Sequence, residues 1–287
     1  MIKEWRLAYS VQMLCRALKV RPSGYYAWLK RPVCARERDE KRLELEILAS
    51  HKRTRQTYGP ERLQQDLADN GIVVGVHRIK RIRKKLGLRC LQKRRFKVTT
   101  DSRHSLPVAE NLVDQEFEAS APNQIWMTDI TDIPTAEGWL YLAGHKDLFT
   151  GEVVGYAMGE RMTKNLVSES LWKAVTAKRP GTGLIHHSDR GSQYCAQEYG
   201  SLLDRFGMRA SMSRKGNCYD NAPMESFWGI LKNERVHHCR YETRREAIRD
   251  ITEYIEIFYN RQRRQAKLGF ISPVNYERLF YEKRLAT

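Results

Sequence analysis

The sequence predicts an α/β protein in which a basic, all-helical region precedes the sheet. Three observations lead to this prediction. The net charge of +17 comes from one end of the chain, apolar runs with strand composition begin near residue 124, and helix-patterned segments alternate with those runs. With 287 residues the chain is long enough for two domains. We place a helical region at 1–98, a linker at 99–120, and the α/β domain with a helical C-terminal extension at 121–287.

Basic residues are concentrated before the α/β part. Residues 1–108 hold 27 Lys and Arg against 10 Asp and Glu, whereas the rest of the chain holds 24 of each kind. A basic excess confined to one region is typical of proteins that bind polyanions such as DNA. A solvated basic surface on ordinary helices is the alternative explanation.

Three further features bear on the compartment. The sequence has no apolar run of about 18 residues, no secretory signal pattern, and six cysteines without CxxC spacing. These features argue against a membrane span, secretion, a disulfide framework and a zinc ribbon. We therefore expect a cytoplasmic protein with no membrane partner.

Helix–turn–helix patterning appears twice in the basic region, at 11–31 and at 60–86. In the second segment, Leu63 and Leu67 lie four residues apart, and Asn70-Gly71 follows as a helix stop signal. The next helix has an apolar stripe formed by Val76, Ile79, Ile82 and Leu86.

The other face of that helix is predicted to be basic. It carries Arg78, Lys80, Arg81, Arg83, Lys84 and Lys85. Such a helix is typical of one that contacts DNA phosphates or enters a groove. We expect the DNA contacts to come from Arg78, Lys80, Arg81, Lys84 and Lys85, and the basic run 91–98 to follow the DNA as part of the connection. A solubilising surface helix is the alternative.

Strand patterning begins after the linker. Three apolar runs at 124–133, 138–148 and 151–160 are joined by short turns, which predicts an antiparallel meander. A helix at 164–178 follows, and then a short strand ending on Asp189. Another helix, a fifth short strand and a further helix complete the order, so we expect a mixed five-stranded sheet flanked by helices.

Three acids stand at the ends or centres of these elements. Asp129 lies within the first strand, Asp189 follows the fourth, and Glu225 lies in a helix that Pro223 is suited to begin. Carboxylates converging from separated elements are what divalent cations with oxygen ligands require. Two such ions can support in-line phosphoryl transfer.

The helix that carries Glu225 has a polar face of its own. Asn221, Glu225, Trp228 and Lys232 follow one another at spacings of four, three and four, so they share one side of the helix. We expect Lys232 to contact the phosphate backbone near the scissile bond. We expect Asn221 either to shape the loop before the helix or to touch DNA.

Four stretches identify a family. "WMTDIT", "HSDRGSQY", "SRKGNCYDNAPMESFWGILKNE" and "YNRQRRQAKLGFISPVNYE" closely resemble the DDE transposases of the insertion sequence three family, in particular their second-reading-frame product. The N-terminal "SGYYAW" and "YGPERLQQDL" are similar too, so the resemblance covers essentially the whole chain. It implies an RNase H-like core, two Mg²⁺ ions (with Mn²⁺ able to replace them), and cleavage and joining of the element's DNA ends.

The resemblance also implies partners and a location. The expected partners are the terminal repeats of the element, target DNA, further copies of the chain assembled on DNA, and the first-reading-frame product, which is normally fused to this one. The expected location is the nucleoid of a bacterial cytoplasm.

In the family, 35 residues separate the second and third acids of the triad, and residues 190–224 give that spacing here. Carried over by motif, Asp129, Asp189 and Glu225 are the catalytic and metal-binding acids. Asp132 is a weak rival because strand alternation directs it to the opposite face from Asp129. Asp220 is the main rival for the third acid.

Histidines suggest a zinc site as an alternative. His186 and His187 precede Asp189, and a His-His-Cys run occupies 237–239, but neither has the partner spacing of a zinc site. Two other functions remain open, namely a DNA-binding regulator with a silent acid core, and an RNase H-like nuclease that hydrolyses without joining.

Overall fold

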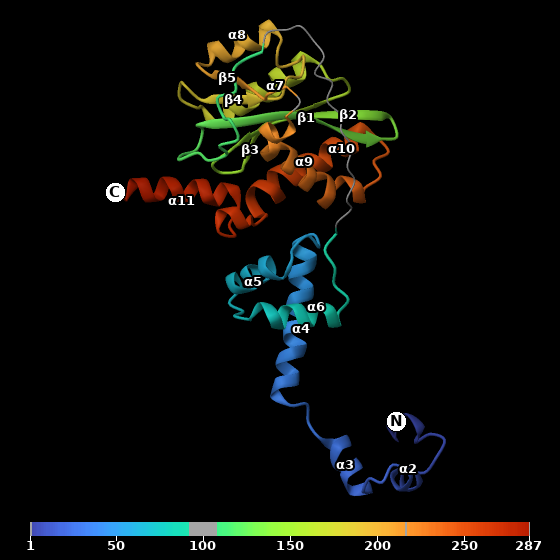
Figure 1. Ribbon diagram of the computed structural model, residues 1–287. Coiled ribbons are helices and arrows are strands. Elements are labelled where there is room, and N and C mark those ends of the chain that lie inside the picture. The colour runs from blue at the N-terminus through green and yellow to red at the C-terminus, as the bar shows by residue number, and fades with distance from the viewer. Residues whose placement is uncertain (1, 92–107, 216, 287) are drawn as a thin grey trace.

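In the computed structural model, a helical N-terminal part leads into a sheet covered by helices on both faces (Figure 1). The structure describes residues 2–91, 108–215 and 217–286. Residues 92–98 of the predicted basic run 91–98 and residues 99–107 of the predicted linker 99–120 lie outside these residues. Among the described helices, none has both the length and the apolar character that a membrane span requires.

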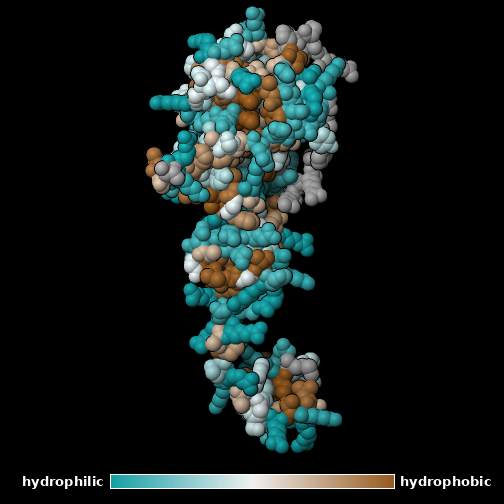
Figure 2. Space-filling view, turned by 60° about the vertical axis from the view of Figure 1, so that its left-hand side comes forward, coloured by the Kyte–Doolittle hydropathy of each residue, from teal (hydrophilic) through white to brown (hydrophobic). Residues whose placement is uncertain are grey.

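The N-terminal helices are α1 (Ile2–Trp5), α2 (Val11–Ala17), α3 (Pro22–Lys30), α4 (Ala35–Arg53), α5 (Pro60–Asp69) and α6 (Val76–Lys85). Both predicted helix–turn–helix segments are therefore helical, and Gly71 follows α5 at φ 75° as the stop signal indicated. The sequence patterning did not single out α4, which packs against α5 and α6. Figure 2 shows apolar side chains at the surface of the first three helices, where Trp5 and Trp28 are each 53% exposed.

The sheet has five strands in the order β3-β2-β1-β4-β5. Its strands are β1 (Ile125–Thr135), β2 (Gly138–Asp147), β3 (Val153–Gly159), β4 (Ile185–Ser188) and β5 (Arg209–Met212). The first three strands form the predicted antiparallel meander, while β4 pairs with β1 and β5 pairs with β4 in parallel. The mixed five-stranded sheet is confirmed.

Helices cover both faces of the sheet (Figure 1). Helices α7 (Lys164–Lys178) and α8 (Gln197–Arg205) lie on one face, and α9 (Ala222–Glu234) and α10 (Arg244–Glu253) lie on the other. Strand β1 alternates between the two cores, since Trp126 and Ile130 pack on the α7 side and Met127 and Ile133 pack on the α9 side.

The C-terminal extension closes one edge of the sheet. Helix α10 continues into the π-helical segment η3 (Tyr254–Gln262), and α11 (Pro273–Leu285) follows. The Asn260 amide bonds both the N–H and the carbonyl of Val153 on the edge strand β3, each at 3.0 Å, and so takes the place of a neighbouring strand. Ile251, Ile255 and Phe258 are buried along this extension, whereas Ile248 near the start of α10 is 37% exposed.

The helical region contacts this extension. The Tyr58 hydroxyl accepts a hydrogen bond from the Arg264 N–H at 2.8 Å and donates one to the Gln262 carbonyl at 3.1 Å.

The described part of the predicted linker, from residue 108 onward, packs against the sheet. Its Leu112 N–H donates to Ser211 Oγ on β5 at 2.9 Å, and Val113 is buried.

Candidate active site

The first acid lies on the face of the sheet that α9 covers. Asp129 is opposite Gly144 on β2. Because Gly144 has no side chain, Trp228 of α9 fits above it; an added Cβ there would lie 3.0 Å from the indole. The Trp228 Nε1–H donates to Asp129 Oδ2 at 3.1 Å, and the Ile130 N–H donates to Asp129 Oδ1 at 2.8 Å.

The second acid follows directly after β4, where the chain leaves the sheet. Asp189 Oδ1 accepts a hydrogen bond from the Gly191 N–H at 2.9 Å, so the turn itself orients the carboxylate. Strand β4 is the parallel neighbour of β1, with His187 level with Met127. Asp189 therefore lies beside the strand that carries Asp129.

The third acid lies in the first turn of α9. The predicted polar face of this helix is the one that meets β1: the Asn221 amide donates to the Thr128 carbonyl at 3.3 Å, and Trp228 reaches Asp129. Glu225 lies between these two contacts. Helical spacing alone thus gave the correct side of the helix.

The three carboxylates affect one another electrostatically. Burial raises the pKa of Asp129 to about 8, and the charges of Asp189 and Glu225 add to the rise, whereas the hydrogen bonds from Ile130 and Trp228 oppose it. Loss of hydration raises the pKa of Glu225, and Asp189 adds to that rise as well. The site therefore holds more negative charge than its own donors neutralise.

Such a donor set fits a divalent cation, because hard oxygen ligands and unneutralised negative charge are what Mg²⁺ requires. Within residues 2–91, 108–215 and 217–286, no three His, Cys, Asp or Glu side chains already lie close enough together to hold an ion.

Asp132 has a different role from Asp129. It lies on the α7 side of β1, opposite Tyr141. Pairing between β1 and β4 stops at Met127, and β1 next forms a bridge at Thr135, with Tyr241. Between these two points Lys232 of α9 places its Nζ 3.4 Å from Asp132 Oδ1. Lys232, an expected DNA contact, thus has a carboxylate partner and is 24% exposed.

Asp220, the rival third acid, is fully engaged elsewhere. Its side chain is completely buried and accepts hydrogen bonds from Arg214, Asn111 and Gln115. The guanidinium of Arg214 holds the pKa of Asp220 far below its ordinary value. This carboxylate has no capacity left for a metal, whereas Glu225 has.

The histidines before Asp189 belong to the protein interior. His186 bonds the Tyr199 hydroxyl at 2.9 Å and His145 at 3.0 Å, and His187 bonds Ser211 at 2.8 Å and Ser213 at 3.3 Å. Burial lowers the pKa of His186 to about 3 and that of His187 to about 4, so both are neutral. Their partners explain them without zinc.

The predicted DNA-contacting side chains of α6 fall into two groups, one that is paired with acids of α4 and one that is exposed to solvent. Three of its predicted DNA contacts form ion pairs with acids of α4, namely Arg78 with Asp39, Arg81 with Glu40, and Lys85 with Glu40 and Glu44. Lys80 and Lys84 are exposed and have no ion pair with any residue that the structure describes.

Arg83 and Asn221 are both more deeply buried than the sequence pattern predicts. Arg83 was placed on the basic face, but it is 8% exposed and its Nη2 donates to Cys90 Sγ at 3.3 Å. Asn221 was expected to touch DNA or to shape the loop; it is 4% exposed and bonded to β1, so it shapes the loop. Its local spacing could not reveal how deep it lies.

Sequence reasoning missed three contributors. It gave Trp228 no role, it left α4 out, and it treated Asp220 only as a rival. The four-residue spacing of Glu40 and Glu44 was the signal for an acidic face on α4.

Comparisons with known proteins agree with this geometry. The integrase core domain family matches residues 119–218, and a second integrase core domain family matches residues 225–279. An HTH-like domain family matches residues 37–96. The transposase InsF for insertion sequence IS3A of Escherichia coli (strain K12) is 38% identical over 96% of this chain and 96% of its own length.

The chain belongs to the IS3 family of transposases. An IS600 insertion element protein of 31 kDa from Shigella sonnei is 56% identical over 94% of this chain and 99% of its own. Among solved structures, the magnesium complex of the HTLV-2 integrase catalytic core domain (trimeric form) is 17% identical over 56% of this chain and 99% of that one, with a TM-score of 0.45.

Membership of the IS3 family makes the chain a DDE polynucleotidyl transferase with an integrase core and an HTH-like DNA-binding domain. Asp129, Asp189 and Glu225 all lie within the two integrase core matches. An integrase core fits a divalent metal cofactor.

Proposed function

We propose that this IS3-family transposase cleaves the ends of its insertion sequence and joins the freed 3′-hydroxyl to a target phosphodiester, with Asp129, Asp189 and Glu225 as the catalytic carboxylates. The observation that carries the proposal is the placement of these acids on adjoining elements: Asp129 on β1, Asp189 directly after its parallel neighbour β4, and Glu225 in the first turn of α9, the helix whose Trp228 bonds Asp129. A fold places three like charges together at a cost in stability, and functional sites are where that cost recurs.

The same three carboxylates would hold two Mg²⁺ ions, with Mn²⁺ as a substitute. When bound, the ions activate the attacking oxygen and stabilise the leaving oxygen in phosphoryl transfer. The chain's own residues orient the ligands, since Trp228 fixes Asp129 and the Gly191 N–H fixes Asp189. Oriented ligands lose less freedom on binding an ion.

DNA contacts are assigned to two surfaces. On α6, Lys80 and Lys84 are exposed and point away from the acids of α4, so we propose them as the main phosphate contacts, with Arg78, Arg81 and Lys85 contributing where their ion pairs open. Next to the acid site, Lys232 is available beside Asp132 of β1. A phosphate there would compete with Asp132 for the ammonium.

The working assembly is larger than one chain. We propose that several copies act together on paired element ends, that the first-reading-frame product is normally fused to this chain, and that the complex resides on the nucleoid in the bacterial cytoplasm. The chain's HTH-like domain and integrase core support the DNA partner.

Strand transfer with labelled element ends tests the catalytic proposal. The complete fused protein with Mg²⁺ is expected to give joined products, and Asp129→Asn, Asp189→Asn and Glu225→Gln should each abolish them while DNA binding persists. Hydrolysed ends without joining would indicate a nuclease. Bound but unchanged DNA, with biological effects unaltered by the three substitutions, would indicate a regulator.

The division of the α6 face is tested by DNA affinity across salt concentrations. Lys80→Ala and Lys84→Ala should each weaken binding and lower the slope of log affinity against log salt by roughly 1. Glu40→Gln should strengthen binding, because it releases Arg81, whereas Lys85 keeps its pair with Glu44. Unchanged binding in both lysine variants would remove α6 from the DNA interface.

A further inference from the structure

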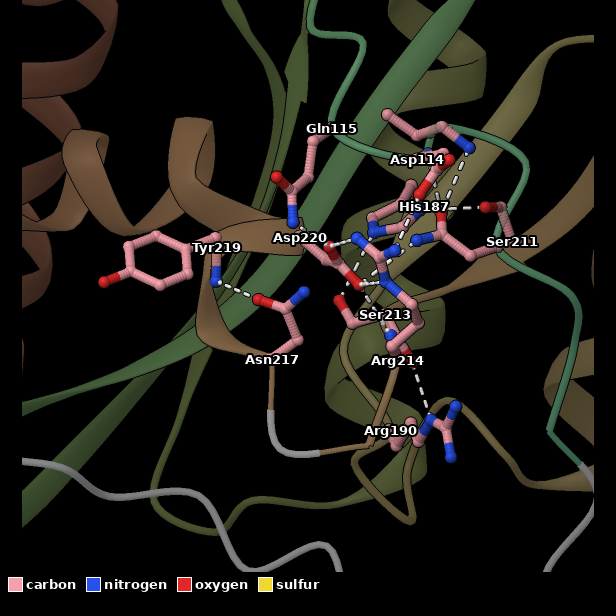
Figure 3. Close-up of polar contacts among 12 residues, drawn as sticks. Asp114, Gln115, His187, Arg190, Ser211, Ser213, Arg214, Asn217, Tyr219 and Asp220 are labelled. Atoms are coloured by element: carbon pink, nitrogen blue, oxygen red, sulfur yellow. Dashed lines mark hydrogen bonds and ion pairs between the residues drawn. The ribbon is translucent and has the colours of Figure 1, made fainter.

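The buried carboxylate of Asp220 is a centre of hydrogen bonding beside the acid site (Figure 3). It accepts three hydrogen bonds from Arg214: from the backbone N–H at 2.7 Å, from Nε at 3.1 Å and from Nη2 at 2.8 Å. It accepts two more from side-chain amides, Asn111 Nδ2 at 3.1 Å and Gln115 Nε2 at 2.9 Å. A carboxylate has about four lone-pair sites, so its capacity is used.

The donors come from two separate segments. Arg214 belongs to the loop that connects β5 to α9, whereas Asn111 and Gln115 belong to the segment that leads into β1. Asp220 therefore closes the β5–α9 loop on itself and also fastens it to the segment that enters the sheet. Charge-assisted bonds of this kind are stronger and more directional than bonds between neutral groups.

The hydrogen bonds to Asp220 hold the chain just before the start of α9. The residue after Asp220 is Asn221, whose amide bonds the Thr128 carbonyl next to Asp129. Glu225 follows within the first helical turn. A shift of Asp220 would therefore be passed along the few residues of chain that lead to Glu225.

The same loop is also tied to the strand that carries the second acid. The carbonyl of Ser213 accepts a hydrogen bond from Arg190 Nε at 2.6 Å, and the Ser213 N–H donates to the Ser188 carbonyl at 3.0 Å. In the sequence, Asp189 lies between Ser188 and Arg190. The loop thus connects the end of β4 to the start of α9, and Asp220 and Arg214 fix its shape.

We propose that Asp220 is a positioning residue, which sets Glu225 against Asp129 and Asp189 by holding the β5–α9 loop through Arg214, Asn111 and Gln115. The inference rests on the proposed catalytic role of the three acids. It gives Asp220 no contact with the metal or with DNA.

The test is Asp220→Asn in the complete fused protein. The substitution keeps the shape of the side chain, removes its charge, and turns an N–H toward one of its donors. A positioning role predicts strand transfer about 10- to 100-fold slower at a fixed Mg²⁺ concentration, the range for residues that orient metal ligands. It also predicts that about tenfold more Mg²⁺ is needed to raise the Tm of the DNA-free protein by the same number of degrees as in the unmodified protein.

The matched control is Asp114→Asn. Asp114 bonds the same guanidinium, through Arg214 Nη1 at 2.9 Å, but its side chain is 70% exposed. The same loss of charge on the same partner should leave strand transfer and the Mg²⁺ response unchanged. Gln115→Ala, which removes one neutral donor from a surface position, is expected to give a loss of a few-fold and covers the case in which Asp220→Asn does not fold.

Three outcomes would overturn the proposal. If Asp220→Asn folds, wild-type strand transfer and a wild-type Mg²⁺ response would show that Asp220 does not position Glu225. If Asp220→Asn does not fold, the same wild-type behaviour in Gln115→Ala would show that these hydrogen bonds have no positioning role. Complete loss at every Mg²⁺ concentration, with fold and DNA binding intact, would make Asp220 a ligand itself. Joining by Asp129→Asn, in contrast, refutes the proposed function and is scored separately.

Discussion

Trp228 and Asp129 are joined by a hydrogen bond of 3.1 Å between the indole Nε1–H and the carboxylate Oδ2, across the interface between α9 and β1. The indole lies over Gly144, the residue opposite Asp129 on β2. One aromatic side chain therefore packs the core beneath the site and also orients the first acid. A substitution at Trp228 can therefore remove the hydrogen bond to Asp129 and keep the aromatic packing.

Trp228→Phe keeps the aromatic packing and removes the hydrogen bond. That bond lowers the pKa of Asp129, so its loss should raise the pKa and leave less of the ionised carboxylate at pH 7. We expect strand transfer to slow about tenfold at pH 7, since hydrogen bonds to charged groups contribute about 1.5–3 kcal/mol, and to recover toward pH 9. The acidic limb of the pH–rate profile is the measurement.

Trp172→Phe is the matched control, because Trp172 is 47% exposed on α7 and packs against Phe206, away from the acids. Its profile should overlay that of the unmodified protein. An acidic limb that stays in place in Trp228→Phe would contradict the prediction.

Asp129→Asn should stabilise the metal-free protein at alkaline pH. The folded state raises the pKa of Asp129 from 3.8 to about 8, so between these values the unfolded chain releases a proton that the folded chain keeps. The stability of the unmodified protein therefore falls as pH rises from about 4 to about 8, and asparagine has no such dependence. We expect a gain of about 1–2 kcal/mol at pH 8, a few degrees in Tm.

The measurement is thermal unfolding with a chelator at pH 5 and pH 8. Asp132→Asn is the control on the same strand, and it should show no gain that grows with pH because its carboxylate has Lys232 as a partner. The argument is refuted if Asp129→Asn changes the Tm by the same amount at pH 5 and at pH 8.

Gly155→Ala should strongly destabilise the sheet. A Cβ at this position of β3 would lie 2.4 Å from the backbone nitrogen of Ala174, so helix α7 would have to move off the strand. We expect a loss of about 3 kcal/mol, as for an overpacked core, measured by urea unfolding. Gly200→Ala in α8 is the control; nothing lies within 4 Å of its added Cβ, and helix propensity predicts a small gain.

Arg263→Met tests the buried ion pair of the C-terminal extension. The Arg263 and Glu234 side chains are 4% and 10% exposed, with Nη2 and Oε1 2.7 Å apart. Removing the arginine leaves a buried carboxylate whose remaining donor, among the residues that the structure describes, is the Tyr254 hydroxyl at 2.7 Å, and should cost about 3–5 kcal/mol.

The matched control for that substitution is Arg278→Met. Arg278 pairs with Glu282 on α11, and both side chains are more than half exposed. Because exposed pairs contribute little, the change in unfolding free energy should stay below about 0.5 kcal/mol. Equal losses in the two methionine variants would mean that burial of the first pair has no energetic effect.

The sequence by itself determined the order of strands and helices from β1 to α9 and the side of α9 that meets the sheet. These follow from local rules: the two-residue alternation of β1 separates Asp129 from Asp132, and helical spacing aligns Asn221, Glu225 and Trp228. The motif spacing then selected Glu225 over Asp220.

Only the tertiary structure decided what each polar side chain faces across the chain. The acids of α4 occupy half of the basic face of α6, Lys232 of α9 reaches Asp132 of β1, and segments about 100 residues apart meet at Asp220. The charge and the hydrophobic periodicity of a segment give the properties of that one helix or strand. Partners contributed by distant elements depend on packing, which no local pattern encodes.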